Sequence, residues 1–526
     1  MNKRYYYLVS FAAIVILLCG LSYYLLGEDT AVCEQYSSVA RAPVISPDYT
    51  ETVIPPNIAP LNFIVKEKGS RYSARIYSTN GGSINLSSKN GRIVIPAGPW
   101  KKLLNANRGQ KLYFDIYAAD ESNQWLRFET ITNTIASEGI DGYLIYRKLH
   151  PSQSRWSEMG IYQRNVENHR ESVVVDNSFY NEVCMNCHAF CGNRPDKMFL
   201  DIRSMKYGSS ALLVEDNATN KIAKRLGFIT WHPSGRLVVC SISSPRLLLH
   251  TARRYVQDIV ELDSALIYYL LDSGTVKTSP KLAQKDRLET YPTWSPDGRY
   301  LYFCSAAMLW SDRYEVPPQR YEEVKYDLLR ISYDPNSDTW GELETVLSAK
   351  DTGLSILEPR ISPDGRWLLF CMCDYGSWPI HHPTSDLYIM DLEAARQTGE
   401  YKYRRLEVNS DQSEAWHSWS TNSRWIAFSS KRRYEVFTRI YFSYVDRAGR
   451  LYKPIILPQK DPEFYDFCLK THTIPEFLIQ PVEVTGEKLV RVICGSRQIA
   501  VDIPISSATP KAEAIPGYEG PWRWRE

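Results

Sequence analysis

The stretch Tyr291–Ser305, YPTWSPDGRYLYFCS, decides the fold because it places a tight turn directly before an apolar strand. Pro296 presets the backbone for the first turn position, Asp297 is tolerated at the next, and Gly298 accepts the positive φ at which the chain reverses. The run YLYFCS that follows is rich in aromatic and apolar residues, which favour strands. The stretch therefore predicts a β-hairpin.

Three further copies of this pattern occur in the chain, and they predict a repeat fold. They begin at Phe228 (FITWHPSGRLVVCS), Glu358 (EPRISPDGRWLLFCM) and Trp416 (WHSWSTNSRWIAFSS). Their period of about 60 residues is typical of a β-propeller with loops inserted into each blade. Weaker strand patterns lie at 198–203, 211–214 and 477–493, so we expect about six blades. We predict an all-β protein with its propeller over residues 151–526.

Two other segments precede the propeller. Residues 57–150 contain short alternating runs between turn signals such as Asn80-Gly81-Gly82, which predicts an immunoglobulin-like or fibronectin-like β-sandwich. Residues 27–56 are rich in Pro, Ser and Thr and are expected to form an extended linker.

The N-terminus predicts a membrane anchor. Residues 5–26 carry no formal charge and suffice to span roughly 30 Å of hydrocarbon as a helix. Lys3 and Arg4 precede them, so residues 1–4 are expected in the cytoplasm and the folded domains in the periplasm, held at the inner membrane by a single pass. A cleaved signal peptide and lipidation of Cys19 remain the alternatives.

A second motif, Cys184-Met185-Asn186-Cys187-His188, lies upstream of the clear repeats. The pattern C-x-x-C-H is the attachment signature of a c-type haem. Two thiols three positions apart can add to the two vinyl groups on one side of a porphyrin, and the following histidine then binds the iron as proximal ligand. We therefore expect one covalent haem c, with its iron on His188, in an attachment segment spanning residues 181–203.

Two other chemistries remain open for these cysteines. Cys184, Cys187, His188 and Cys191 could hold zinc, although the adjacency of Cys187 and His188 makes tetrahedral ligation awkward. The C-x-x-C could also be a dithiol redox pair, but such pairs are expected in a βαβ context and the surroundings here are predicted all-β.

The second axial ligand of the iron decides between electron transfer and ligand chemistry. Met198 follows His188 in the segment GNRPDKMF, and His250 ends the run RLLLH. Either residue is a candidate metal ligand, and another residue or an open position is the remaining possibility. An open position would favour gas binding or peroxide chemistry.

The S-P-D-G-R turns resemble those of the TolB-like (PD-type repeat) β-propeller family. A more specific resemblance is to a subgroup of exported, membrane-anchored TolB-like proteins with a c-type haem C-x-x-C-H site. It extends over residues 54–478 and includes IPPNIAPLNF, CMNCHAF, TYPTWSPDGRYLYF, WHSWSTNSRWIAFSSKR and LPQKDPEFYDFCLKTHTIPEF. The resemblance implies the propeller, the haem and a histidine near position 250, but no biochemical activity. One departure is that FLDIR follows Met198 where a pattern such as LFHIR is expected, which removes one candidate ligand.

These observations favour a cell-envelope haem protein that transfers electrons or senses redox state while bound to an envelope protein or redox partner. The alternatives are a periplasmic interaction scaffold with a structural haem and a haem-dependent peroxide-type enzyme. The chain has no G-x-S-x-G elbow, P-loop or dinucleotide fingerprint, so no hydrolase or nucleotide chemistry is predicted. Its net charge of +2 predicts no nucleic-acid partner.

Overall fold

The structure is a computed structural model that describes residues 35–152, 156–177, 183–204, 206–216, 218–224, 226–250, 257–312 and 315–500, apart from the side chain of Asn186. The predicted anchor at 5–26, Cys19 and the charges before the anchor lie outside these residues. Within the described ranges, no helix is both long enough and apolar enough to cross a membrane.

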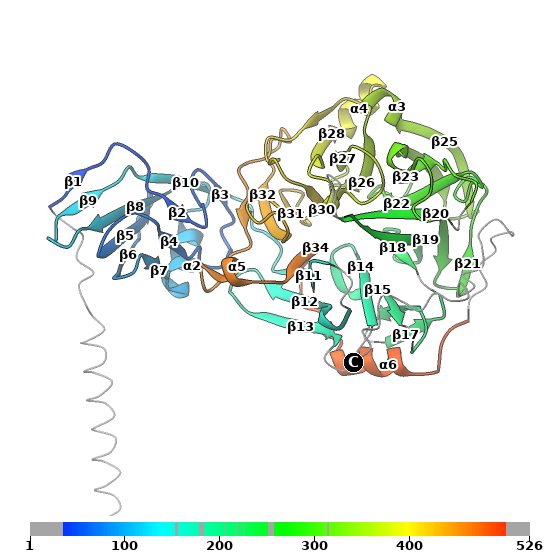
Figure 1. Ribbon diagram of the computed structural model, residues 1–526, viewed down its shortest axis with the longest axis horizontal. Coiled ribbons are helices and arrows are strands. Elements are labelled where there is room, and N and C mark those ends of the chain that lie inside the picture. The colour runs from blue at the N-terminus through cyan, green and yellow to red at the C-terminus, as the bar shows by residue number, and fades with distance from the viewer. Residues whose placement is uncertain are drawn as a thin grey trace, which may run out of the picture. The chain divides into compact units, whose positions relative to one another are not determined.

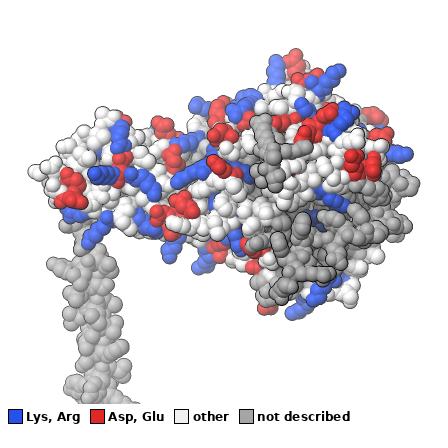
Figure 2. Space-filling view, viewed as in Figure 1, with Lys and Arg blue, Asp and Glu red and all other residues white. Residues whose placement is uncertain are grey.

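The described chain forms two compact units. The first contains residues up to 51, 60–135 and 458–465, and the second contains 52–59, 136–457 and 466 onward. Basic and acidic side chains alternate over the described part of the face shown in Figure 2, which agrees with the net charge of +2.

The first unit is built around strand β8 (Lys111–Ala119). β8 pairs antiparallel with β5 (Arg71–Ser78), β9 (Trp125–Arg127) and β10 (Ile131–Ile135). β6 (Ser83–Ser88) extends the sheet beyond β5, and β1 (Ser37–Ser38) runs parallel to β9. A smaller sheet has the order β2 (Ile45–Ser46), β4 (Phe63–Val65), β7 (Arg92–Ile93).

Two features of this unit differ from the predicted sandwich of strands alone. Helix α2 (Ala97–Ala106) buries Trp100, Leu103 and Leu104, whose spacing places them on one helical face. The distant segment 458–465 also belongs to this unit, where Arg92 forms ion pairs with Asp461 and Glu463 at 2.7 Å each.

The second unit is a β-propeller, and six four-stranded antiparallel sheets are found among its described residues (Figure 1). Five sheets are each made of four consecutive strands. Their strands are β14 (Val183–Cys191), β15 (Arg194–Ser204), β16 (Ser210–Glu215), β17 (Ala218–Ile222); β18 (Gly227–Trp231), β19 (Leu237–Leu249), β20 (Gln257–Leu270), β21 (Thr275–Lys277); β22 (Arg287–Trp294), β23 (Tyr300–Ala307), β24 (Asp327–Asp334), β25 (Thr339–Leu347); β26 (Ser355–Ile361), β27 (Trp367–Cys373), β28 (Asp386–Asp391), β29 (Tyr403–Arg405); β30 (Glu414–Trp419), β31 (Trp425–Ser430), β32 (Arg439–Tyr444), β33 (Ile455–Ile456).

The sixth sheet closes the ring by joining the two ends of the propeller sequence. β34 (Thr471–Leu478) pairs antiparallel with β11 (Tyr143–Leu149), which continues into β12 (Gly160–Asn165) and β13 (Glu171–Asp176). This closure protects sheet edges that would otherwise be exposed. The number of blades agrees with the expected six.

Each blade packs its two faces against the two neighbouring blades. Val238 and Cys240 of β19 contribute to one buried cluster, whereas Leu237 and Val239 contribute to the next. Because alternate residues of a strand point to opposite faces, both sets must be apolar. This explains the continuous apolar runs after the turns.

The remaining elements are short. They are β3 (Val53–Ile54), η1 (Trp156–Glu158), η3 (Tyr321–Glu323), α3 (Ala349–Thr352), η4 (Pro379–His381), α4 (Leu392–Thr398), α5 (Phe464–Phe467) and α6 (Gly486–Cys494).

Candidate functional site in the central cavity

The inner strand of every blade is interrupted by a β-bulge at the same place. In β22, for example, pairing with β23 breaks between Thr290 and Thr293, which leaves Tyr291 and Pro292 as the two bulge residues. In five of the six blades the first bulge residue is recorded with a positive φ, which is uncommon for any residue except glycine and is often found at functional sites. These residues are Phe228 (44°), Tyr291 (51°), Glu358 (54°), Trp416 (51°) and Ile474 (54°).

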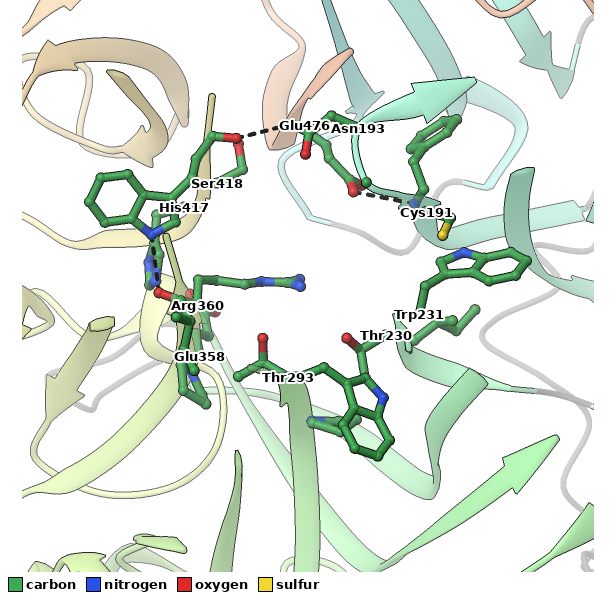
Figure 3. A pocket seen from close by; sticks show the side chains of 18 of the residues that line it. Cys191, Asn193, Thr230, Trp231, Thr293, Glu358, Arg360, His417, Ser418 and Glu476 are labelled. Atoms are coloured by element: carbon green, nitrogen blue, oxygen red, sulfur yellow. Dashed lines mark hydrogen bonds between the residues drawn. The ribbon is translucent and has the colours of Figure 1, made fainter. Parts of the chain in front are cut away.

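The bulges supply the walls of a central cavity of about 480 Å³, a volume within the range of small-molecule sites. The residue that follows each bulge lines this cavity, so each blade contributes one side chain of this kind. Figure 3 shows the hydroxyls of Thr230 and Thr293 facing the cavity, with Arg360 reaching toward its middle. The complete set is His188, Thr230, Thr293, Arg360, Ser418 and Glu476.

Three of the first bulge residues form an aromatic cluster. Phe228 and Tyr291 have ring centroids 4.3 Å apart, and Phe228 stacks with Trp416 at 6.2 Å. All three line the cavity. Trp378, outside the lining, packs against Phe228 and Trp416 at 5.7 Å from each. The cavity wall is therefore apolar where these rings meet and polar at the residues that follow the bulges.

The cavity combines one exposed cation, Arg360, with the buried carboxyl group of Glu358 and the partly buried one of Glu476. Arg360 is exposed, and its guanidinium makes no ion pair within the part of the chain that the structure describes. Burial raises the pKa of Glu476 to about 7, while the charge of Arg360 opposes this shift. Burial likewise raises the pKa of Glu358 to about 7. A ligand that reaches the cavity would meet the positive charge of Arg360, which is not paired with any carboxylate of the described residues.

The C-x-x-C-H motif lies in β14, the inner strand of the second blade, and not in a helix. The pairing of β14 with β15 breaks between Met185 and His188, so Cys187 is a bulge residue. Cys187 and His188 both line the central cavity, as does Cys191. The bulge therefore brings one thiol and the imidazole of the motif to the same cavity.

His188 is the motif residue whose surroundings best suit a metal ligand. Its side chain is fully buried, and neither ring nitrogen makes a well-formed hydrogen bond among the described residues, although the nearby backbone of Ile474 acts to raise its pKa. Nε2 lies 3.9 Å from Glu476 Oε2. Burial, with a contribution from the charge of Arg147, lowers the pKa of His188 to about 3. The imidazole is therefore neutral, which is the form that binds metals.

The two thiols of the motif differ in their surroundings. Cys187 Sγ accepts a hydrogen bond of 3.5 Å from the backbone N–H of Phe228 and borders the cavity. Cys184 is 1% exposed, lies outside the cavity lining and accepts a hydrogen bond of 3.2 Å from Arg203. The imidazole and Cys187 border the cavity, whereas Cys184 packs with Leu149 and Met159 in a separate buried cluster. A haem bonded to both thiols would therefore require this part of β14 to rearrange.

Neither candidate for the second axial ligand lines the cavity. Met198 of β15 is opposite Phe190 and packs with it in the buried cluster between two blades. His250 directly follows β19, at the far end of the hairpin formed with β20. The register of β15 and the length of that hairpin explain why the structure does not bring these residues to His188.

Several residues of the site were not among the predicted ones. They include Arg360, Glu476 and Glu358, which all line the cavity. Arg360 and Glu476 each follow the bulge of their inner strand, whereas Glu358 is itself a bulge residue. In the sequence, the signal is a polar residue in the segment shortly before each turn, as in EPRIS and WHSWS.

Comparisons with known proteins identify similar structures only. The sequence matches no known protein family and no curated protein. The structure is similar to that of TolB from Acinetobacter baumannii, with a TM-score of 0.40 and 13% identity over 73% of this chain and 85% of TolB. It is also similar to oligogalacturonate lyase from Vibrio parahaemolyticus, with a TM-score of 0.33 and 11% identity over 78% of this chain and 98% of the lyase.

A third similar structure is that of a puromycin hydrolase. The TM-score is 0.35 and the identity is 14%, over 60% of this chain and 45% of the hydrolase, so the match spans less than half of that enzyme. These similarities transfer no activity or ligand to this chain.

Proposed function

We propose that this chain is a cell-envelope c-type haem protein whose propeller houses the haem, and that it transfers electrons or senses redox state. The observation that carries the proposal is the state of His188. Its imidazole is neutral and buried, borders the cavity, and makes no well-formed hydrogen bond through either nitrogen among the described residues. Buried polar atoms are rarely left unpaired, so an orphaned imidazole beside two thiols favours a missing ligand.

Each residue of the motif has a distinct role in this proposal. Cys184 and Cys187 would form the two thioether bonds, and His188 would bind the iron. When bound, a haem c supplies reversible one-electron exchange at its iron. The surrounding chain keeps water from the imidazole and holds it neutral by burial. Arg360 places a positive charge in the same cavity, where it favours anionic groups.

The proposed setting is the periplasmic face of the inner membrane, with residues 5–26 as anchor. Attachment of a c-type haem outside the membrane agrees with that orientation. The partner would be an envelope protein or redox protein that docks on the propeller, because propellers offer a wide rigid face. No nucleic-acid partner is proposed.

The first experiment is a reduced-minus-oxidised absorption spectrum of the exported part, made in a host competent for haem c attachment. We expect a c-type spectrum in the wild type and haem that stays with the chain in denaturing gels. Replacing both Cys184 and Cys187 by Ala should abolish the covalent haem. Cys191→Ala is the matched control because Cys191 also lines the cavity, and this variant should keep the haem. A colourless, folded wild-type protein would refute the proposal.

A haem-dependent peroxide activity is the second candidate function. It is favoured by the positions of Met198 and His250, which both lie outside the described cavity lining. An iron without a second protein ligand can bind small molecules. A high-spin spectrum together with peroxide turnover would select this candidate, whereas a low-spin spectrum would select electron transfer.

A further inference from the structure

A second group of metal-ligating side chains lies beside the cavity, apart from the C-x-x-C-H motif. Glu358, Cys371 and His417 place one potential ligand atom each within 4.8 Å of one another. Their exposed fractions are 4%, 0% and 3%, so all three are buried. Glu358 and His417 also line the central cavity.

The repeat geometry explains why these residues meet. Glu358 is the first bulge residue of β26, and His417 is the second bulge residue of β30 in the next blade. Cys371 of β27 is opposite Leu357, directly before the bulge of its own blade. The three groups therefore converge at the junction of two blades.

The distances match those between the ligands of a tetrahedral zinc ion. Cys371 Sγ lies 3.5 Å from Glu358 Oε2 and 3.7 Å from His417 Nδ1. Zinc–sulfur bonds of about 2.3 Å and zinc–nitrogen or zinc–oxygen bonds of about 2.0 Å, at tetrahedral angles, separate such ligand atoms by about 3.5 Å. A zinc ion would thus need little movement of the side chains.

The hydrogen bonds around the group already orient it for metal binding. His417 Nε2 lies 3.1 Å from the carbonyl oxygen of Leu369, so Nε2 carries the hydrogen and Nδ1 directs its lone pair toward Cys371. The backbone N–H of Trp416 donates to Glu358 Oε2 at 2.6 Å. Metal-binding histidines and carboxylates usually have such supporting hydrogen bonds. Glu358 Oε1 is buried and has no hydrogen-bond partner among the described residues.

The neighbouring blade provides an internal comparison. Cys304 is opposite Thr290, the position that matches Cys371 opposite Leu357. Tyr291 and Pro359 there replace Glu358 and His417, so Cys304 has no equivalent set of ligands. Serine occupies the same position in two other blades, as Ser241 and Ser429. The position therefore does not require cysteine for folding.

We propose that Glu358, Cys371 and His417 form a zinc site. The ligands are one carboxylate oxygen, the Cys371 thiolate and His417 Nδ1, a mixture of oxygen, sulfur and nitrogen that suits zinc. Zn²⁺ replaces the thiol hydrogen of Cys371, which leaves as a proton to solvent, and no oxidation occurs. Three protein ligands leave the fourth position for water or for a ligand from the cavity.

The test is zinc binding by the full chain, measured by elemental analysis after dialysis against zinc chloride and then against metal-free buffer. Zinc is counted separately from iron, so the result does not depend on the haem. We expect about one zinc per chain in the wild type and in the control variant Cys304→Ser, and at least a tenfold lower content in Cys371→Ser. Zinc-edge X-ray absorption should show one sulfur ligand at about 2.3 Å.

A second variant, Glu358→Gln, guards against a folding defect in Cys371→Ser, and circular dichroism reports the fold of each. Glu358→Gln should also lower the zinc content. Three results would overturn the proposal: no zinc in the folded wild type, zinc at the wild-type level in both ligand variants, or more than one sulfur around the metal. The last result would point instead to the cysteines of β14.

Discussion

His188 Nε2 and Glu476 Oε2 lie 3.9 Å apart, between the inner strand of the second blade and the strand that closes the ring. The imidazole of the C-x-x-C-H motif therefore faces a residue nearly three hundred positions later in the chain. Glu476 also accepts a hydrogen bond of 3.3 Å from the backbone N–H of Phe190. Closure of the propeller thus completes the surroundings of the candidate haem ligand.

The turn glycines should differ in how much an added methyl group destabilises the fold. A Cβ at Gly298 would overlap His232 Nε2, whereas a Cβ at Gly365 would have its nearest neighbour, Pro296 Cγ, at 4.0 Å. Both have positive φ, 71° and 75°. We expect Gly365→Ala to lower the free energy of unfolding by about 1–2 kcal/mol from backbone strain alone. Gly298→Ala should lower it by this amount and by about 1–3 kcal/mol more, because of the overlap with His232. Urea unfolding measures both.

His232→Ser is the rescue for this pair, because serine occupies the equivalent turn position as Ser295 and Ser362. It should remove most of the extra cost of Gly298→Ala, so that the two substitutions are not additive. Equal costs for the two glycine variants would contradict the steric argument.

The buried Glu289 should make stability fall as pH rises. Burial raises the pKa of its carboxyl to about 8, from 4.5 in the unfolded chain. Between these values the folded state holds the proton that the unfolded state releases, so the contribution of Glu289 to the free energy of unfolding decreases with rising pH. The free energy of unfolding of Glu289→Gln, taken relative to that of the wild type, should therefore rise by about 3 kcal/mol between pH 5 and pH 8. Urea unfolding at each pH measures it.

Glu323→Gln is the control for this pH dependence. Glu323 is exposed, and its hydrogen bond with Arg320 lowers the pKa of its carboxyl, so it stays ionised across the window. The difference between this variant and wild type should not change with pH. If the difference in stability between Glu289→Gln and wild type did not change with pH, the folded wild type would accommodate the charged carboxylate of Glu289.

Local sequence predicted the hairpins of four blades because each has a turn such as Pro296-Asp297-Gly298 before an apolar strand. It did not reveal how the ring closes, because β34 and β11, which pair in the closing sheet, lie far apart in sequence. Helix α2 was missed although Trp100, Leu103 and Leu104 follow helical spacing, since the surrounding alternating runs favoured strands.

The sequence also predicted only part of the site. The motif identified Cys187 and His188 directly, and both line the cavity. Arg360 and Glu476 are single polar residues in different repeats, and their common role depends on an inner-strand bulge that no short pattern encodes. Met198 lies near His188 along the chain, but strand register places its side chain in the core.

The aromatic cluster should stabilise the propeller at the cavity wall. Phe228 contacts Tyr291, Trp416 and Trp378, and it is only partly buried. We expect Phe228→Ala to lower the free energy of unfolding by about 2–4 kcal/mol, near the lower end of the range for replacing a large aromatic residue by alanine. Acrylamide should also quench tryptophan fluorescence more strongly in this variant. Phe467→Ala is the control, because Phe467 is 78% exposed and should change neither quantity.

Arg360 should raise the reduction potential of a haem held by His188. Its guanidinium extends into the cavity that His188 lines, and a nearby positive charge disfavours the more positive, oxidised iron. An interaction of about 1 kcal/mol corresponds to roughly 40 mV for one electron, so Arg360→Gln should lower the midpoint potential by tens of millivolts. Arg299→Gln, at an 80% exposed arginine in a turn, is the control and should leave the potential unchanged. A redox titration followed by absorbance measures both, and an unchanged or higher potential in Arg360→Gln would show that the haem lies outside the field of this cavity.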